Sequence, residues 1–180
     1  VDTVGININL VLNTDVPQGK IAFTNARIIT MNGDEVIENG TILVEGNRIV
    51  AVGKTGEIAV PNDAKTIDAS GKTIMPGLVD VHAHLGTFSP QKQWSYYANL
   101  AYGVTTTHDP SSTTEMVFSQ SEMVKAGHMV GPRVYSTGTI LYGADGNFKA
   151  VINSLDDARS HLRRMKAIGA FSVKSYNQPR

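Results

Sequence analysis

The chain has 180 residues, of which 41% are hydrophobic and 18% are charged, a composition typical of a globular protein and not of a disordered one. Its 16 basic and 16 acidic residues cancel to a formal charge of zero, which gives no electrostatic case for binding nucleic acid or an anionic membrane surface. It contains no cysteine, which excludes disulfides and thiolate metal sites, and no apolar run approaches the roughly 20 residues of a membrane span.

Residues 1–20 lack a starting Met and the basic and apolar regions of a signal peptide. Their apolar residues first alternate as in a strand (Val4, Ile6, Ile8 and Leu10), and the pattern breaks at Pro17. We therefore expect this segment to be a linker or the tail of an upstream segment, and the chain to be an excerpt of a longer protein. The compartment stays open between the cytoplasm and export.

Residues 21–75 consist of short apolar stretches separated by turn signals, which are Asn32-Gly33, Asn39-Gly40 and Gly46-Asn47. Asn-Gly pairs between apolar stretches are strong turn signals because both residues tolerate a positive φ. We predict a small antiparallel β domain over this range.

From Pro76 onward strands alternate with helices. The expected elements are strands at 78–84, 103–109, 133–138 and 170–176, and helices at about 94–102, from the capping-box sequence at 112–115 to Gly127, and from Ser154 to Gly169. The last helix would pack through one face, made of Leu155, Ala158, Leu162, Met165 and Ile168. Repeated β-α-β units imply a parallel sheet covered by helices.

Residues 76–180 thus predict an α/β fold with four β/α units. Four units fit the first half of a (β/α)₈ TIM-like barrel, here truncated, because a whole barrel typically needs about 250 residues. An open doubly wound sheet that binds a nucleotide is the other topology. It is disfavoured because no strand leads into a Gly-x-Gly-x-x-Gly turn.

Two histidines end the first strand of this region, in the sequence "PGLVDVHAHLG". Strand alternation predicts one face with Asp80, His82 and His84, and an opposite face with Val79, Val81 and Ala83 that packs under the helices. The end of a barrel strand is where barrel enzymes carry catalytic groups, and neutral imidazole is a good ligand for zinc and similar ions. The spacing alone also fits a simple pair of hydrogen-bonded histidines.

The stretch "KTIDASGKTIMPGLVDVHAHLG" resembles the signature of the amidohydrolase superfamily, in which a small β domain precedes a metal-dependent (β/α)₈ barrel whose first strand ends in His-x-His. The segment "NARIITMNGDEVIENGTILVEGNRIVAVG" is similar to the lead-in of imidazolonepropionase-like and dipeptidase-like members. The segments "GVTTTHDPS", "GPRVYSTGTILYGA" and "SLDDARSHLRRMKAIGAFSVKSYNQPR" resemble amidohydrolases fused behind a TolB-type β-propeller. The resemblance extends from about Asp15 to the end.

The resemblance implies that His82 and His84 bind the more buried of one or two divalent ions, with zinc as the expected metal. Lys174 falls where many members carry a lysine carboxylated by CO₂, whose carbamate can bridge two cations, whereas an unmodified ammonium has no lone pair to offer. Alternation would point Lys174 inward together with Ser172 and Tyr176. An ordinary lysine that reaches solvent is the alternative.

Three further residues are candidates for contacting substrate or for supporting the metal ligands: Asp80, His108 and Tyr142. We expect His128 and His161 to lie on the surface. The aromatic residues Trp94, Tyr96 and Tyr97 are expected to pack a helix onto the barrel or a neighbouring domain.

The implied function is hydrolysis of a C–N bond in an amide, cyclic amide or peptide by a metal-activated water. The family's remaining ligands and its general-base aspartate come from later strands, so we expect this chain alone to bind metal weakly and to show no appreciable turnover. The alternative is a non-catalytic half-barrel that serves as an assembly module and pairs with a second copy or the missing half, because open sheet edges and apolar faces favour association. The expected partners are a small-molecule or peptide substrate and, by the resemblance, an upstream β-propeller, without nucleic acid or a membrane span.

Overall fold

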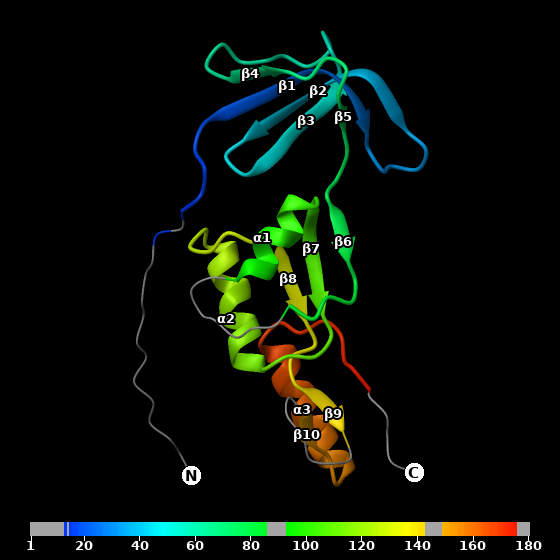
Figure 1. The fold of residues 1–180 in the computed structure, drawn as a ribbon, viewed down its shortest axis with the longest axis vertical. Helices are drawn as coiled ribbons and strands as arrows, with labels where there is room; N and C mark the ends of the chain where they lie inside the picture. Colours follow the sequence, from blue (N-terminus) through cyan, green and yellow to red (C-terminus); the bar gives the residue numbers. More distant parts are fainter. Residues whose placement is uncertain (1–12, 14, 86–92, 143–148, 176–180) are drawn as a thin grey trace.

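A computed structural model of the chain describes residues 13, 15–85, 93–142 and 149–175. One β-sheet forms one end of the molecule, and parallel strands with their helices follow along its long axis (Figure 1). The strand expected within residues 4–10 and the inward-facing Tyr176 lie outside the described residues. None of the helices formed by the described residues has the length and apolarity that crossing a bilayer demands.

The first sheet contains five strands: β1 (Lys20–Ile29), β2 (Val36–Glu45), β3 (Arg48–Lys54), β4 (Lys65–Asp68) and β5 (Thr73–Ile74). The order is β3-β2-β1-β4, and β5 also pairs with β1. The β1–β2 and β2–β3 pairs are antiparallel, whereas β4 and β5 run parallel to β1. The prediction of a purely antiparallel unit is therefore wrong for its last two strands, because the chain crosses back after β3 and returns along β1.

The Asn-Gly signals of this sheet have different outcomes. Gly33 and Gly46 have φ values of 60° and 57° in the turns on either side of β2, as predicted. Asn39 and Gly40 lie inside β2, so the turn predicted there is wrong. Gly40 pairs with Ala26 where the β1–β2 register shifts, and a Cβ on Gly40 would collide with the side chain of Ile28. Because Gly40 has no side chain, β1 and β2 can pack closely here. The core beside them is formed by Ala26, Ile28, Ile42 and Ala69.

The second sheet contains three strands in the order β6-β7-β8, with bounds β6 (Leu78–Asp80), β7 (Val104–Asp109) and β8 (Arg133–Ser136). Both pairs are parallel. The helices α1 (Trp94–Ala101) and α2 (Thr114–Lys125) connect these strands and pack with them around one core, made of Ala83, Leu85, Tyr96, Val117, Met129 and Val134. A mixed α/β fold with parallel β-α-β units is therefore present. The completion of a (β/α)₈ barrel remains a proposal.

The helix α2 begins where it was expected but without the expected cap. Its N-cap residue is Thr113, whose side chain makes no capping hydrogen bond. The neighbouring Thr114 hydroxyl instead lies 2.8 Å from the Thr139 hydroxyl, which ties the helix to the chain after β8. The N-cap residue therefore lies one position later than the capping box at Ser112 and Glu115 requires.

The last part of the described chain contains β9 (Ile140–Tyr142), β10 (Lys149–Val151) and α3 (Leu155–Ala167). The two strands form a parallel pair that the sequence pattern did not predict. Ser154 caps α3, since its hydroxyl accepts a hydrogen bond of 3.1 Å from the Asp157 amide, and Gly169 follows the helix with a φ of 97°. The start of the helix after Ser154 and its stop at Gly169 were both predicted.

The predicted packing face of α3 is only partly right. Met165 is buried, and it shares the buried face with His161. Leu155, Leu162 and Ile168 are exposed. The helix therefore packs through a narrower stripe than the one predicted.

The strand predicted at 170–176 is not formed over residues 170–175, the part of it that the structure describes. Residues 171–174 have no strand pairing, and Ser175 makes a single parallel bridge with Leu141. The ring of Phe171 packs edge-on against Tyr135 of β8, with centroids 5.6 Å apart. This segment thus contacts the edge strand through side chains and without a ladder of backbone hydrogen bonds.

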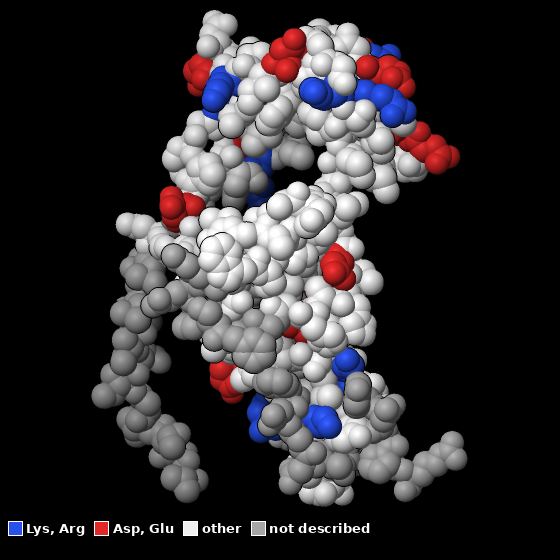
Figure 2. Space-filling view, in the orientation of Figure 1, with Lys and Arg blue, Asp and Glu red and all other residues white. Residues whose placement is uncertain are grey.

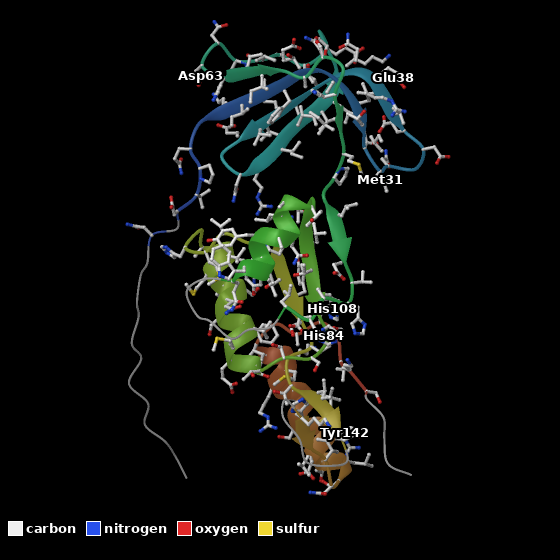
Figure 3. The ribbon with its side chains drawn as sticks, in the orientation of Figure 1. Met31, Glu38, Asp63, His84, His108 and Tyr142 are labelled. Carbon is white, nitrogen blue, oxygen red and sulfur yellow. The ribbon has the colours of Figure 1, made fainter. Side chains whose placement is uncertain are left out.

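Charged residues are unevenly distributed on the face shown in Figure 2. Lysine, arginine, aspartate and glutamate gather over the five-stranded sheet, and few of them lie over α1 and β6. The candidate residues His84, His108 and Tyr142 lie away from the five-stranded sheet. Figure 3 shows His84 and His108 where β6 and β7 end, and Tyr142 further along, on β9.

Candidate metal centre at the ends of β6 and β7

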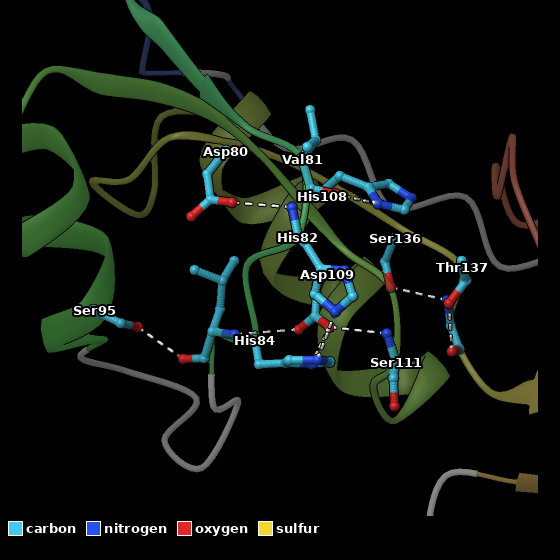
Figure 4. A network of polar contacts seen from close by, with 12 residues as sticks. Asp80, Val81, His82, His84, Ser95, His108, Asp109, Ser111, Ser136 and Thr137 are labelled. Carbon is cyan, nitrogen blue, oxygen red and sulfur yellow. Dashed lines mark hydrogen bonds and ion pairs between the residues drawn. The ribbon is translucent and has the colours of Figure 1, made fainter. Parts of the chain in front are cut away.

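The strand β6 stops at Asp80, two residues before the first histidine. The Asp80 carboxylate oxygen Oδ1 accepts a hydrogen bond of 2.9 Å from the His82 amide, which bends the chain into a turn (Figure 4). The Ala83 amide then donates a bond of 2.9 Å to the His108 carbonyl, so the turn stays attached to the end of β7. The predicted alternation through residue 84 is therefore wrong, and Asp80 shapes the backbone and does not share a strand face with the histidines.

The turn nevertheless brings His82 and His84 together. Their Nε2 atoms lie 3.2 Å apart, and their ring centroids are 5.0 Å apart with the planes inclined by 75°. Both residues are exposed, while Ala83 between them is buried in the core. Two imidazole edges thus converge on one point at the surface of the described chain.

Asp109, the last residue of β7, is a buried carboxylate that the sequence reasoning missed. It is 2% exposed. Its Oδ2 accepts a hydrogen bond of 3.4 Å from the Leu85 amide, its Oδ1 accepts one of 3.0 Å from the Ser111 amide, and Oδ1 lies 3.7 Å from His84 Nδ1. Burial raises the pKa of this carboxyl, and the two amides and the nearby His84 oppose that rise. The sequence does contain a signal for this residue, because Asp109 directly follows His108 at the end of the predicted strand 103–109.

His108 lies beside the pair but its two ring nitrogens have other partners. Its Nδ1 is 3.3 Å from the Val81 carbonyl, which can only accept, so Nδ1 carries the proton. Its Nε2 accepts a bond of 2.7 Å from the Ser172 hydroxyl. His108 therefore holds the segment after α3 against β6 and β7.

A hollow of about 510 Å³ lies beside His108 and is lined mainly by apolar side chains from β6, β7, β8 and the segment after α3: Val79, Val81, Thr106, Thr107, His108, Tyr135, Phe171 and Ser172. Val79 is 59% exposed and Val81 is 72% exposed. The prediction that these two valines pack under the helices is therefore wrong, because both of them line the hollow and are exposed.

The remaining candidates are placed as follows. Lys174 is partly buried and follows Ser172 by two residues, and Tyr142 lies on β9 with the Lys149 ammonium 4.2 Å from its ring centroid. His128 is exposed, as expected. His161 is buried, and its Nε2 donates a bond of 3.0 Å to the Thr139 carbonyl, so the prediction of a surface position is wrong.

The three aromatic residues of α1 also differ from one another. Tyr96 is fully buried, and its hydroxyl donates a hydrogen bond of 2.7 Å to Gln120 Oε1. Trp94 is 77% exposed and contacts Tyr97, which is also exposed. Tyr96 therefore packs the helix as predicted, whereas contacts of Trp94 and Tyr97 with a neighbouring domain stay a prediction.

The histidine pair fits two positions of a metal site. Ligand nitrogens at about 2.0–2.1 Å from a tetrahedral zinc ion lie about 3.3 Å apart, close to the separation of 3.2 Å between the two Nε2 atoms. Within the described residues, no group of three or more His, Cys, Asp or Glu side chains is arranged to hold a metal ion. A complete site would therefore need ligands besides these two residues.

Sequence comparison finds relatives that match part of the chain. The curated 5-methylthioadenosine/S-adenosylhomocysteine deaminase of Bacillus cereus (strain AH187) is 49% identical over 70 residues, which are 37% of this chain and 15% of that protein. The deaminase of the same name from Bacillus thuringiensis subsp. konkukian (strain 97-27) is 47% identical over 68 residues, with the same shares. No family model matches the chain.

Structure comparison extends the likeness over most of the chain. A prolidase candidate from Bifidobacterium longum superposes with a TM-score of 0.70 at 25% sequence identity, over 86% of this chain and 40% of that protein. The ochratoxinase of A. niger superposes with a TM-score of 0.66 at 17% identity, over 87% of this chain and 46% of that protein. A solved amidohydrolase superposes with a TM-score of 0.66 at 20% identity, over 86% of this chain and 46% of that protein.

The chain thus spans less than half the length of these solved structures, and its curated matches cover a smaller share of the deaminases. The relatives are named as deaminases, and the solved structures, which share the fold, are named as a prolidase candidate, an ochratoxinase and an amidohydrolase. Together with the histidine pair at the end of β6, these likenesses support the resemblance of the chain to the N-terminal portion of the amidohydrolase superfamily.

Proposed function

We propose that this chain supplies the first ligands of the metal centre of a hydrolase that cleaves a C–N bond. The observation that carries the proposal is the convergence of His82 Nε2 and His84 Nε2 to 3.2 Å at the end of a parallel strand. Two neutral imidazoles at this separation offer lone pairs to one divalent ion, and zinc suits such nitrogen ligands. Deaminases and prolidases, the names carried by its relatives, act on C–N bonds.

Lys174 is the proposed third ligand, in carboxylated form. The hydrogen bond from Ser172 to His108 anchors the segment that carries Lys174 against the ends of β6 and β7. Lysine offers a metal only donors while it is an ammonium, whereas the carbamate formed with CO₂ is anionic and has two acceptor oxygens.

A divalent ion bound by these residues would supply Lewis acidity for the attack of water on a carbonyl or similar carbon. The residues of the chain have simpler tasks: Asp80 fixes the turn, and the two histidines present their Nε2 atoms to one point. A general base is not assigned to any residue of the chain. Asp109 does not suit that role, because its carboxylate is buried and accepts two backbone hydrogen bonds.

The proposal is tested by zinc binding, measured by competition with a chromophoric chelator. We expect the purified chain to bind one equivalent of zinc, and His82→Ala and His84→Ala each to weaken binding by at least tenfold. His128→Ala, which removes an exposed histidine away from the pair, is the matched control and should leave the affinity unchanged. Equal affinities for the wild type and both pair variants would rule out the site.

Carboxylation of Lys174 is tested separately by native mass spectrometry in bicarbonate buffer with zinc. We expect a mass increase of one CO₂, absent in Lys174→Met. Lys166→Met, a variant on the exposed side of α3, should keep the increase. An unmodified wild-type chain under these conditions would remove Lys174 from the proposed site.

A second candidate function is a non-catalytic half-barrel that acts in assembly. It is favoured by the apolar hollow beside His108, whose walls include the exposed Val79, Val81 and Phe171. Exposed apolar patches of this kind commonly mark interaction sites. A chain that binds no zinc but associates through this hollow would support the second function over the first.

A further inference from the structure

Asp109 stands apart from the other acidic side chains that the structure describes, because it is buried and lies at the junction of two strand ends. Among the described acidic residues it is the one that approaches a histidine of the pair to within ion-pair distance. Asp80, by contrast, contacts the backbone amide of His82. The two aspartates therefore act on different parts of the turn: Asp80 binds its backbone, and Asp109 lies beside the ring of His84.

The geometry around Asp109 leaves few orientations for its carboxylate. The Leu85 amide engages Oδ2, and the Ser111 amide engages Oδ1, so the group is held from two sides at fixed distances of 3.4 Å and 3.0 Å. The same Oδ1 faces the Nδ1 edge of His84 at 3.7 Å, slightly beyond hydrogen-bond length. A hydrogen bond between these two atoms requires the exposed His84 ring to move toward Oδ1 by roughly half an ångström.

We propose that Asp109 is a positioning residue that keeps the proton of His84 on Nδ1 and thereby turns the Nε2 lone pair toward the metal. This inference rests on the proposed function and deepens it. A carboxylate accepts a hydrogen bond and cannot donate one, so it favours the tautomer with a proton on the nitrogen it faces. Metal-binding histidines commonly donate their second ring N–H to such a group, which fixes the ring orientation.

The purely structural alternative is that Asp109 only stabilises the turn that contains Ser111. Asp68 offers a matched comparison, since its Oδ1 accepts a hydrogen bond of 3.1 Å from the Ser70 amide with the same spacing of two residues. Asp68 lies at the end of β4, in the other sheet from both histidines. Substituting it disturbs the same kind of turn without touching the pair.

The test compares Asp109→Asn with Asp68→Asn in the whole chain by two readouts. The first is zinc affinity, which we expect to fall 10–100-fold in Asp109→Asn and to stay unchanged in Asp68→Asn. The second is the ¹⁵N spectrum of the imidazole nitrogens in the metal-free protein. It should show the Nδ1–H form of His84 in the wild type and a shift toward the Nε2–H form in Asp109→Asn.

A folded Asp109→Asn variant with unchanged zinc affinity and an unchanged His84 tautomer would overturn the inference. A wild-type chain whose His84 carries its proton on Nε2 would overturn it without any variant, which covers the case that Asp109→Asn fails to fold. A wild-type chain that binds no zinc refutes the proposed function, while the tautomer comparison in the metal-free protein still decides the role of Asp109.

Discussion

The hydroxyl of Ser172 donates a hydrogen bond of 2.7 Å to Nε2 of His108, which joins the segment after α3 to the end of β7. His108 in turn donates from Nδ1 to the Val81 carbonyl, 3.3 Å away. These two bonds link three stretches that lie far apart in the sequence. They explain how a segment without regular strand pairing is held near the histidine pair.

The Ser172–His108 bond predicts the effect of Ser172→Ala. Loss of one partly buried hydrogen bond should lower the free energy of unfolding by about 0.5–1.5 kcal/mol and speed amide exchange in residues 171–175. Hydrogen exchange by mass spectrometry measures the second effect. Ser160→Ala, on the exposed side of α3, is the control, and equal exchange in both variants would contradict this role.

Tyr96 predicts a pH-dependent loss of stability. Burial raises the pKa of its hydroxyl from 10.0 to about 12. The unfolded chain therefore loses this proton first, and the free energy of unfolding falls as the pH rises from about 10 to about 12. In Tyr96→Phe this part of the fall should disappear, whereas Tyr97→Phe, at an exposed position, should behave as the wild type. Identical pH profiles for the wild type and Tyr96→Phe in chemical denaturation would refute the prediction.

The same substitution should also lower stability near neutral pH. Tyr96 donates to Gln120 Oε1 in the core, and its removal deprives a buried acceptor of this donor. We expect Tyr96→Phe to cost about 1–3 kcal/mol in urea denaturation.

The hydrogen bond that caps α3 predicts different stabilities for two variants of Ser154. Ser154→Ala removes the acceptor for the Asp157 amide and should cost about 1 kcal/mol, whereas Ser154→Asp keeps an acceptor and should cost much less. Thermal unfolding, monitored by circular dichroism, distinguishes the stabilities of the two variants. A Ser154→Asp variant as unstable as Ser154→Ala would show that the cap does not stabilise the helix.

The apolar hollow predicts association of the chain with a second copy. Val81 and Phe171 are both largely exposed on its wall, so burying them against another apolar surface is favourable. Sedimentation velocity should show a dimer or larger species at micromolar concentration, and Val81→Lys with Phe171→Lys should shift the chain toward the monomer. Val50→Lys, at an exposed position of β3, is the control. A wild-type monomer at all concentrations would contradict this prediction.

Much of the fold follows from periodicity and turn chemistry. The β-α-β order after Pro76 and the cap at Ser154 come from local signals that tertiary packing does not override. Gly40 shows the limit, because an Asn-Gly pair predicts a turn, whereas packing against Ile28 uses the same glycine inside a strand. The parallel pairing of β4 with β1 depends on a long-range crossover that no local pattern encodes.

The candidate site was predicted for a partly wrong reason. Alternation in an extended strand would bring His82 and His84 to one face, but the chain turns at Asp80 and the rings converge through that turn. Asp109 was missed because its role depends on the pairing of β6 with β7, which sets two distant segments beside each other. Lys174 remains a prediction that rests on family resemblance.

Zinc K-edge X-ray absorption on the zinc-loaded chain measures the ligands of the bound ion. The proposed centre predicts two imidazole nitrogens at about 2.0–2.1 Å from zinc in the wild type and one in His84→Ala. A zinc shell without imidazole, or one whose imidazole count is the same in the wild type, His82→Ala and His84→Ala, would contradict a metal centre built on this pair.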